Sequence, residues 1–182
     1  MTQTFEDLGL SSGLLETLQS LGYVTPTPVQ AASIQHMLAG EDVIAQAQTG
    51  TGKTAAYALP IIENIDISVR HTQALVLAPT RELAVQVAAS FKNYAKHRNL
   101  NTVAIYGGQP IERQFRFLAT GAHVVVATPG RLIDHINRGT ISLGNVKCIV
   151  LDEADEMLAM GFIEDVEQIL AVIPQPHQTL SL

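Results

Sequence analysis

Short apolar runs alternate along this chain with longer segments in which apolar residues recur at helical spacing. The runs are rich in β-branched residues and almost continuously apolar, which is the pattern of strands buried on both faces of a sheet. Five strands are predicted, at residues 43–47, 74–78, 102–106, 123–127 and 147–151, and the sequence from 179 to 182 is typical of the start of another. The alternation of strands and helices predicts an α/β fold with a mainly parallel central sheet flanked by helices.

The predicted helices begin at capping residues. Thr27-Pro28 and Thr128-Pro129 each offer a hydroxyl N-cap followed by proline at the first helical position. Thr80 and Pro110 are placed to start two more helices, which end near positions 96 and 118. Residues 12–21 carry their apolar side chains on one helical face and precede the first strand, so we expect them to form an N-terminal addition to the core.

The composition limits the class of protein. A chain of 182 residues with 47% apolar residues suits one compact domain. The formal charge of −6 and the pI of about 5.4 argue against a broad nucleic-acid footprint, so any such contact must be local. The single cysteine, Cys148, excludes an internal disulfide, and no apolar stretch is long enough to span a membrane. We therefore expect a cytoplasmic chain without a membrane segment.

The segment Ala47–Thr54 lies between a predicted strand and a predicted helix and ends in Gly-Lys-Thr, the pattern of a phosphate-binding loop. The glycines allow successive backbone N–H groups to point at phosphate oxygens. Lys53 is predicted to reach the β and γ phosphates, and the Thr54 hydroxyl to bind Mg²⁺. Ala47 stands where such loops usually have glycine. The predicted phosphate-binding residues are Gln48, Thr49, Gly50, Thr51, Gly52, Lys53 and Thr54.

A second motif, Asp152-Glu153-Ala154-Asp155, directly follows the strand predicted at 147–151. A carboxylate at the carboxyl end of a parallel strand faces the crevice in which ligands of α/β sheets bind. We predict that Asp152 holds Mg²⁺, partly through water, and that Glu153 orients and deprotonates an attacking water. Taken alone, the motif is equally well explained as a helix N-terminus whose acidic residues complement the helix dipole. Asp155 can face the site or be solvated.

Six motifs of this chain resemble those of the DEAD-box RNA helicases, specifically their first RecA-like lobe, and they occur in an ordered series along the chain. Asp152–Asp155 matches the tetrapeptide that names the family, and Ala47–Thr54 matches its phosphate loop, including the leading alanine. Residues 22–30 resemble its adenine-recognising Q motif, and Phe5 stands where the family has an aromatic residue that stacks near the base. The segments that resemble its RNA-facing motifs are Pro79-Thr80-Arg81-Glu82-Leu83, Gly107-Gly108 and Thr128-Pro129-Gly130-Arg131.

The resemblance covers essentially the whole chain and is closest in character to bacterial members. It implies one N-terminal RecA-like lobe of three layers, with a helical element carrying the Q motif at residues 1–40, a core at 41–182, and a second lobe outside this chain. It implies ATP and Mg²⁺ as cofactors, and RNA as a partner bound through its backbone with little sequence preference. The full protein would be an RNA-stimulated ATPase that locally unwinds short RNA duplexes. This lobe alone is expected to be monomeric, to bind nucleotide and to hydrolyse it poorly.

The chemistry of single residues agrees with these roles. The Gln30 amide can pair with N6 and N7 of adenine, an edge that guanine does not reproduce, so ATP should be preferred over GTP. Phe5 and Tyr23 are assigned to the same nucleotide site, and Asp155 to coupling between the lobes. Hydroxyl, backbone N–H and guanidinium groups at helix starts can bind consecutive phosphates. The predicted RNA-binding residues are Pro79, Thr80, Arg81, Gly107, Gly108, Thr128, Pro129, Gly130 and Arg131.

Two other functions are compatible with these motifs. One is a lobe of another RecA-like helicase or translocase that acts on DNA, which a preference for DNA or efficient use of GTP would favour. The other is a non-catalytic module that binds nucleotide or RNA, which would show no hydrolysis even with the second lobe restored. The histidines have no metal-ligand spacing, so no zinc site is expected.

Overall fold

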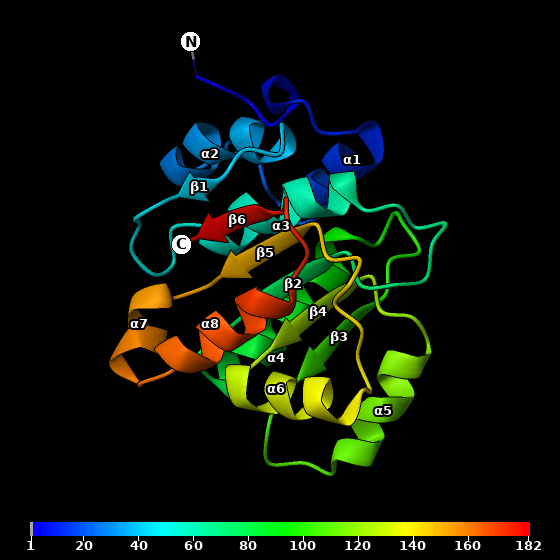
Figure 1. Ribbon diagram of the computed structural model, residues 1–182. Helices are drawn as coiled ribbons and strands as arrows, with labels where there is room; N and C mark the ends of the chain where they lie inside the picture. The colour runs from blue at the N-terminus through cyan, green and yellow to red at the C-terminus, as the bar shows by residue number, and fades with distance from the viewer. Residues whose placement is uncertain (1) are drawn as a thin grey trace.

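Six strands form one sheet in the order β1-β6-β5-β2-β4-β3, and every neighbouring pair is parallel (Figure 1). This computed structural model describes residues 2–182. The predicted α/β class is confirmed, and the sheet is parallel throughout. The strands are β1 (Val43–Ile44), β2 (Ala74–Leu77), β3 (Thr102–Ile105), β4 (Val124–Ala127), β5 (Cys148–Leu151) and β6 (Gln178–Ser181).

The helices predicted from capping residues begin where those residues stand. Thr80 caps its helix with a hydroxyl that accepts a hydrogen bond from the backbone N–H of Leu83 at 3.2 Å. Pro110 is the N-cap of its helix rather than its first residue. The helices are η1 (Glu6–Leu8), α1 (Ser12–Ser20), α2 (Pro28–Leu38), α3 (Lys53–Asn64), α4 (Arg81–Tyr94), α5 (Ile111–Ala119), α6 (Pro129–Arg138), α7 (Ala154–Ala159) and α8 (Ile163–Val172). In the described part of the chain, none of them is long and apolar enough to cross a membrane.

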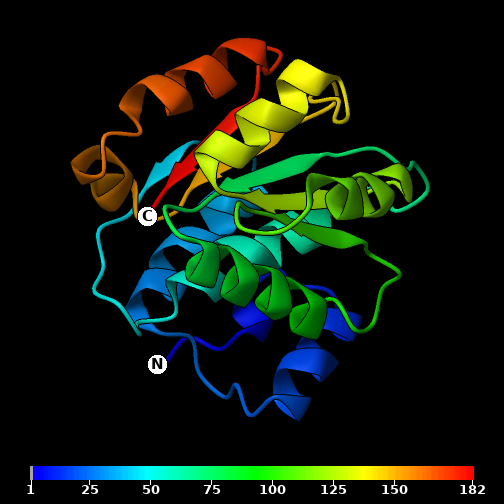
Figure 2. The same cartoon turned by 90° about the horizontal axis from the view of Figure 1, so that it is seen from below.

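Helices cover both faces of the sheet, which produces three layers (Figure 2). The alternation of side chains along β2 shows the division, because Ala74 and Val76 belong to one hydrophobic cluster while Leu75 and Leu77 belong to another. The first cluster is shared with η1 and α1–α4, and the second with α6–α8. The N-terminal helices therefore belong to the same core as the helices that follow them.

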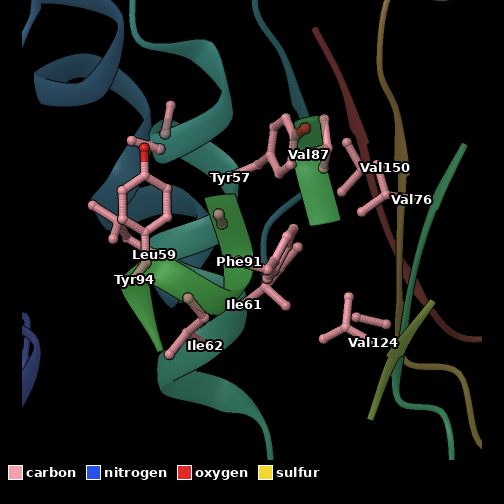
Figure 3. Packing of buried hydrophobic residues seen from close by; sticks show 14 of the residues in the cluster. Tyr57, Leu59, Ile61, Ile62, Val76, Val87, Phe91, Tyr94, Val124 and Val150 are labelled. Atoms are coloured by element: carbon pink, nitrogen blue, oxygen red, sulfur yellow. The ribbon is translucent and has the colours of Figure 1, made fainter. Parts of the chain in front are cut away.

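Helix α3 is the most enclosed helix of the fold. Its residues from 55 to 62 are all buried, because α3 packs against α2 and α4 as well as against the sheet. Figure 3 shows side chains of α3 and α4 directed toward Val76, Val124 and Val150 of the strands. The rings of Tyr57 and Phe91 lie 6.3 Å apart in this layer. Burial on all sides fixes α3, and with it the position of Lys53 at its first turn.

Five of the six predicted motifs lie at the carboxyl edge of the sheet, because each follows a strand, whereas the Q motif precedes β1 and leads into α2. The strand ends are level there, since Leu77 pairs in register with both Ala127 and Leu151. The sheet order divides this edge into two halves. We call the motifs after β1 and β5 the phosphate-loop half (residues 47–54 and 152–155). The motifs after β2, β3 and β4 form the arginine half (residues 79–81, 106–109 and 128–131).

Candidate functional site

The phosphate loop connects β1 to the buried helix α3. Gly52 is the N-cap of α3 and has a φ of 86°, which L side chains rarely adopt. A Cβ atom at this position would also collide with the side-chain amide of Gln30. Glycine is therefore required at position 52, and the loop delivers Lys53 and Thr54 to the positive end of the helix.

Gln30 joins the start of α2 to this loop. Its Oε1 accepts a hydrogen bond from the Thr27 backbone N–H at 3.0 Å, and its Nε2 donates to the Gly52 carbonyl at 3.1 Å. The side chain is only 1% exposed. One Nε2 hydrogen and one Oε1 lone pair remain for a further partner. The pairing of Gln30 with adenine stays a prediction.

The two aromatic residues assigned to the nucleotide site belong to the hydrophobic core beside α2. Phe5 is buried and meets Tyr23 edge to face, with ring centroids 6.1 Å apart. The hydroxyl of Tyr23 lies 2.7 Å from that of Tyr94 on α4. Packing of this kind fixes the N-terminal element on α4. The stacking of a base near Phe5 stays a prediction.

Asp152 is buried directly after β5, and the hydroxyl of Tyr57 on α3 donates a hydrogen bond to its Oδ2 at 2.7 Å. Burial raises the pKa of Asp152, while the Tyr57 hydrogen bond and the charge of Lys53 oppose that rise. The pKa of Tyr57 is in turn raised well above its usual range, chiefly by burial and then by the Asp152 charge. Tyr57 thus fixes the orientation of the carboxylate that the sequence assigns to Mg²⁺.

Glu153 has a strained backbone. Its φ is 51°, and within residues 2–182 it is the one residue other than glycine with a positive φ. Its N–H donates to the Leu182 carbonyl at 2.9 Å, which helps to hold this conformation. Such strain costs on the order of 1–3 kcal/mol and is concentrated at functional sites. It turns the chain sharply from β5 into α7.

The two motifs of the phosphate-loop half line one cleft of about 570 Å³. Its wall contains one cationic side chain and three carboxylates. Neither of the side-chain ion pairs in the described residues, His36–Glu41 and Asp134–Arg138, involves Lys53. The lining residues are Ala47, Gln48, Thr49, Lys53, Glu153, Asp155 and Glu156.

The oxygen donors of this cleft fit a Mg²⁺ ion that is bound together with phosphates. The cleft is acidic overall, so a polyphosphate is repelled unless a divalent cation accompanies it. In the part of the chain that the structure describes, no cluster of three or more acidic, histidine or cysteine side chains can hold a metal by itself. Mg²⁺ commonly takes one or two protein oxygens and completes its shell with phosphate and water. Asp152 and Thr54, which the sequence assigns to Mg²⁺, are next to cleft-lining residues in the chain but are not part of the lining, so their binding of Mg²⁺ stays a prediction.

The arginine half brings its three segments into contact. The guanidinium group of Arg81 lies over the ring of Tyr106, 5.2 Å from its centroid. Gly108 has a φ of 86°, which favours glycine, and it lies beside Arg81, since a Cβ there would be in contact with Arg81 Nη1 at 3.4 Å. Arg131 donates a hydrogen bond from Nη1 to the Gln109 carbonyl at 3.1 Å. The first turns of α4 and α6 begin beside these arginines and carry N–H groups without intrahelical acceptors.

Three residues of the site escape prediction from sequence. They are Tyr57, which holds Asp152; Tyr106, which stacks on Arg81; and Gln114, which bonds to Arg131. Tyr57 and Gln114 lie within helices whose patterns indicate only packing. Tyr106 is the last residue of the strand predicted at 102–106. Its place at the end of a strand is a usable signal, because every motif of this edge follows a strand.

A family assignment follows from this ordered set of motifs on a parallel sheet. The chain belongs to the DEAD/DEAH box helicase family, which it matches over residues 27–182. It is 58% identical to the ATP-dependent RNA helicase DeaD of Klebsiella pneumoniae over 97% of this chain and 28% of that protein. It is 54% identical to the DEAD-box ATP-dependent RNA helicase CshA of Bacillus cereus over 97% of this chain and 34% of that protein.

A solved structure shares the fold. The crystal structure of a DEAD box protein from the hyperthermophile Methanococcus jannaschii superposes with a TM-score of 0.94 at 45% identity, over 98% of this chain and 49% of the other. The predicted family, its bacterial type and the RecA-like fold are confirmed. The chain spans about a third of the length of the curated relatives it matches.

Proposed function

We propose that this chain is the ATP-binding and RNA-contacting lobe of an RNA-dependent ATPase that separates short RNA duplexes. One observation carries the proposal: the phosphate loop with the acidic motif, and the three segments predicted to bind an RNA backbone, occupy adjacent halves of one sheet edge. The relatives DeaD and CshA, which are ATP-dependent RNA helicases, agree with that arrangement. Residues 1–40 would supply adenine recognition, and residues 41–182 the phosphate and RNA sites.

The phosphate-loop half supplies the groups for phosphoryl chemistry. Lys53 and the N–H groups at the start of α3 would bind the phosphates, and Thr54 and Asp152 would hold Mg²⁺, which would neutralise phosphate charge. Glu153 orients the attacking water and accepts its proton. Its strained backbone sets the direction in which its Cα–Cβ bond leaves the chain.

The arginine half supplies groups for an RNA backbone. Guanidinium groups, hydroxyls and helix N-termini contact phosphates without reading bases, so little sequence preference is expected. The overall charge of −6 adds no general attraction for nucleic acid, so affinity depends on these local contacts. Hydrolysis by the lobe alone should be slow, because transition-state arginines supplied by a second lobe are worth about 10³–10⁵ in rate.

Nucleotide selectivity tests the first half of the proposal. Calorimetric titration should show that ADP binds, that GDP binds much more weakly, and that Gln30→Ala removes the difference. Equal binding of ADP and GDP by the unaltered chain would show that Gln30 does not read the base. Because Gln30 also bonds to Gly52, a melting curve of the variant is needed to separate loss of recognition from loss of loop structure.

Nucleic-acid selectivity separates the proposal from its alternatives. Fluorescence anisotropy with a labelled single-stranded RNA and a DNA of the same sequence should give tighter binding to the RNA. Preference for the DNA would favour a DNA helicase or translocase. RNA-stimulated turnover should remain very low for this chain and appear when the second lobe is supplied. Its absence then would favour a non-catalytic binding module.

A further inference from the structure

Gln114 on α5 forms a buried hydrogen-bonded centre beneath the arginine half. Its side chain is fully buried, with 0% exposure. Its Nε2 donates to the Tyr106 carbonyl at 2.8 Å. Its Oε1 accepts from Nε2 of His135 at 2.8 Å and from Nη1 of Arg131 at 3.3 Å. One amide thus joins the segment after β3 to the first two turns of α6.

Neutral His135 takes a single tautomer in this centre, because its Nε2 faces an acceptor. Burial, followed by the charge of Arg131, lowers the pKa of His135 below its ordinary value. Because Gln114 Oε1 can only accept, the imidazole proton must reside on Nε2, which leaves Nδ1 to accept from the Thr140 hydroxyl at 2.8 Å. The amide of Gln114 has one orientation, with its NH₂ group toward Tyr106, because the Tyr106 carbonyl can only accept and the Arg131 guanidinium can only donate.

The same centre controls all three segments of the arginine half. The segment from Tyr106 to Gln109 is held at both ends, through the Tyr106 carbonyl by Gln114 and through the Gln109 carbonyl by Arg131. Arg81 in turn stacks on the Tyr106 ring. A shift of the Gln114 amide would therefore move both arginines and the glycine pair between them.

We propose that Gln114 is a positioning residue for RNA binding, and that His135 keeps its amide in the required orientation. Gln114 touches no ligand itself. It holds Arg131 and the 106–109 segment at a fixed spacing before RNA arrives, so the protein does not have to order them on binding. This inference rests on the proposed RNA-contacting function.

Three variants separate the contacts of the centre. Gln114→Ala removes all of them, whereas Gln114→Glu keeps acceptors for His135 and Arg131 but cannot donate to the Tyr106 carbonyl. His135→Gln keeps an N–H donor toward Gln114, whereas His135→Ala does not. Gln168→Ala, an exposed glutamine on α8, is the matched control.

Hydrogen exchange measures the positioning directly. We expect faster exchange across residues 106–109 in Gln114→Ala and Gln114→Glu than in the unaltered chain, with no change in the phosphate loop. Unchanged exchange in both variants would overturn the inference, whatever the RNA result. If Gln114→Ala fails to fold, which a loss of ADP binding would report, Gln114→Glu and the His135 variants decide the question.

RNA affinity measures the consequence. Anisotropy should show about 10-fold weaker RNA binding for Gln114→Ala and for His135→Ala, with ADP affinity unchanged and His135→Gln close to the unaltered chain. The loss in Gln114→Ala combined with Arg131→Ala should be smaller than the product of the single losses, because both act through one contact. Equal RNA affinity in the unaltered chain and both Gln114 variants would reject the inference alone. No RNA binding by the unaltered chain would reject the proposed function and the inference with it.

Discussion

The two halves of the sheet edge differ in charge and in how their side chains are held. The phosphate-loop half presents one lysine among several carboxylates, and Lys53 has no ion-pair partner in residues 2–182. In the arginine half, Arg131 and Arg81 are already engaged, the first by hydrogen bonds and the second by an aromatic ring. One half is shaped mainly by backbone conformation, with glycines and a strained Glu153, whereas the other is shaped by a buried polar network.

If the proposed ligands bind, the difference implies that they meet different energetic conditions. A nucleotide would have to bring cations into an acidic cleft, so its affinity should depend on Mg²⁺. An RNA backbone would meet groups whose positions are fixed in advance, which would lower the entropy cost of binding. The following changes test whether the halves are independent, from the largest expected effect to the smallest.

Lys53→Ala should abolish most nucleotide binding and leave RNA binding intact. Removal of two or more charge-assisted hydrogen bonds to phosphate is expected to weaken Mg²⁺–ADP binding about 100-fold in calorimetry. RNA anisotropy on the same sample serves as the control, because Lys53 lies outside the arginine half. A parallel loss of RNA affinity would show that the halves are coupled.

Arg131→Ala should produce the opposite pattern. RNA binding is expected to weaken about 10-fold, and the slope of log affinity against log salt concentration should fall by about 1, since one phosphate contact is lost. ADP affinity should not change. A loss of affinity with an unchanged salt slope would mean that Arg131 supports the structure rather than contacting a phosphate.

Asp152→Asn should weaken Mg²⁺–nucleotide binding yet stabilise the fold. Because burial raises the folded pKa of Asp152 above its unfolded value, its contribution to stability is present below the unfolded pKa of 3.8 and is lost as pH rises through the folded pKa. Asparagine carries no charge to bury and can still accept from Tyr57. We expect a melting temperature about 2–4 °C higher at pH 7, the shift that 1 kcal/mol gives in a domain of this size, and a smaller gain at pH 5. A lower melting temperature at pH 7 would contradict the prediction.

Tyr57→Phe should have the smallest effect. Loss of the hydroxyl removes a hydrogen bond that lowers the pKa of Asp152, so that pKa should rise further. Mg²⁺–ADP binding should weaken about 3-fold at pH 6 and less at pH 8, where the carboxylate is ionised more fully. An effect independent of pH would indicate lost packing instead, and RNA affinity is the control.

The sequence alone predicts the strands and most helices, because their signals are local. Buried parallel strands have continuous apolar runs, and Thr80 and Thr128 mark helix starts by their own chemistry. Pro110 opens its helix as predicted, from the N-cap, and the first helical residue is Ile111. Helices α7 and α8 were not predicted as separate helices. The order of strands in the sheet depends on pairing between distant residues, which no local pattern carries.

The residues of the site also differ in whether a local sequence pattern predicts them. The phosphate loop and the acidic motif have fixed spacings, and their positions at strand ends place them on one edge. Tyr57 and Gln114 have no such spacing, because each acts through a partner far away in the chain: Asp152 for one, Tyr106 and Arg131 for the other. In sequence they are indistinguishable from an ordinary tyrosine or glutamine of a packed helix.

The place of β6 in the sheet has a consequence for the order in which the molecule is built during synthesis. Strand β1 pairs only with β6, which spans residues 178–181, whereas β2, β3, β4 and β5 can pair with one another once residue 151 has left the ribosome. The arginine half can thus form while the first strand is still unpaired. The phosphate loop is anchored about thirty residues later, when β6 fills the gap between β1 and β5. A nascent chain stalled between these points would present the segments proposed to face RNA before it could form the proposed nucleotide site.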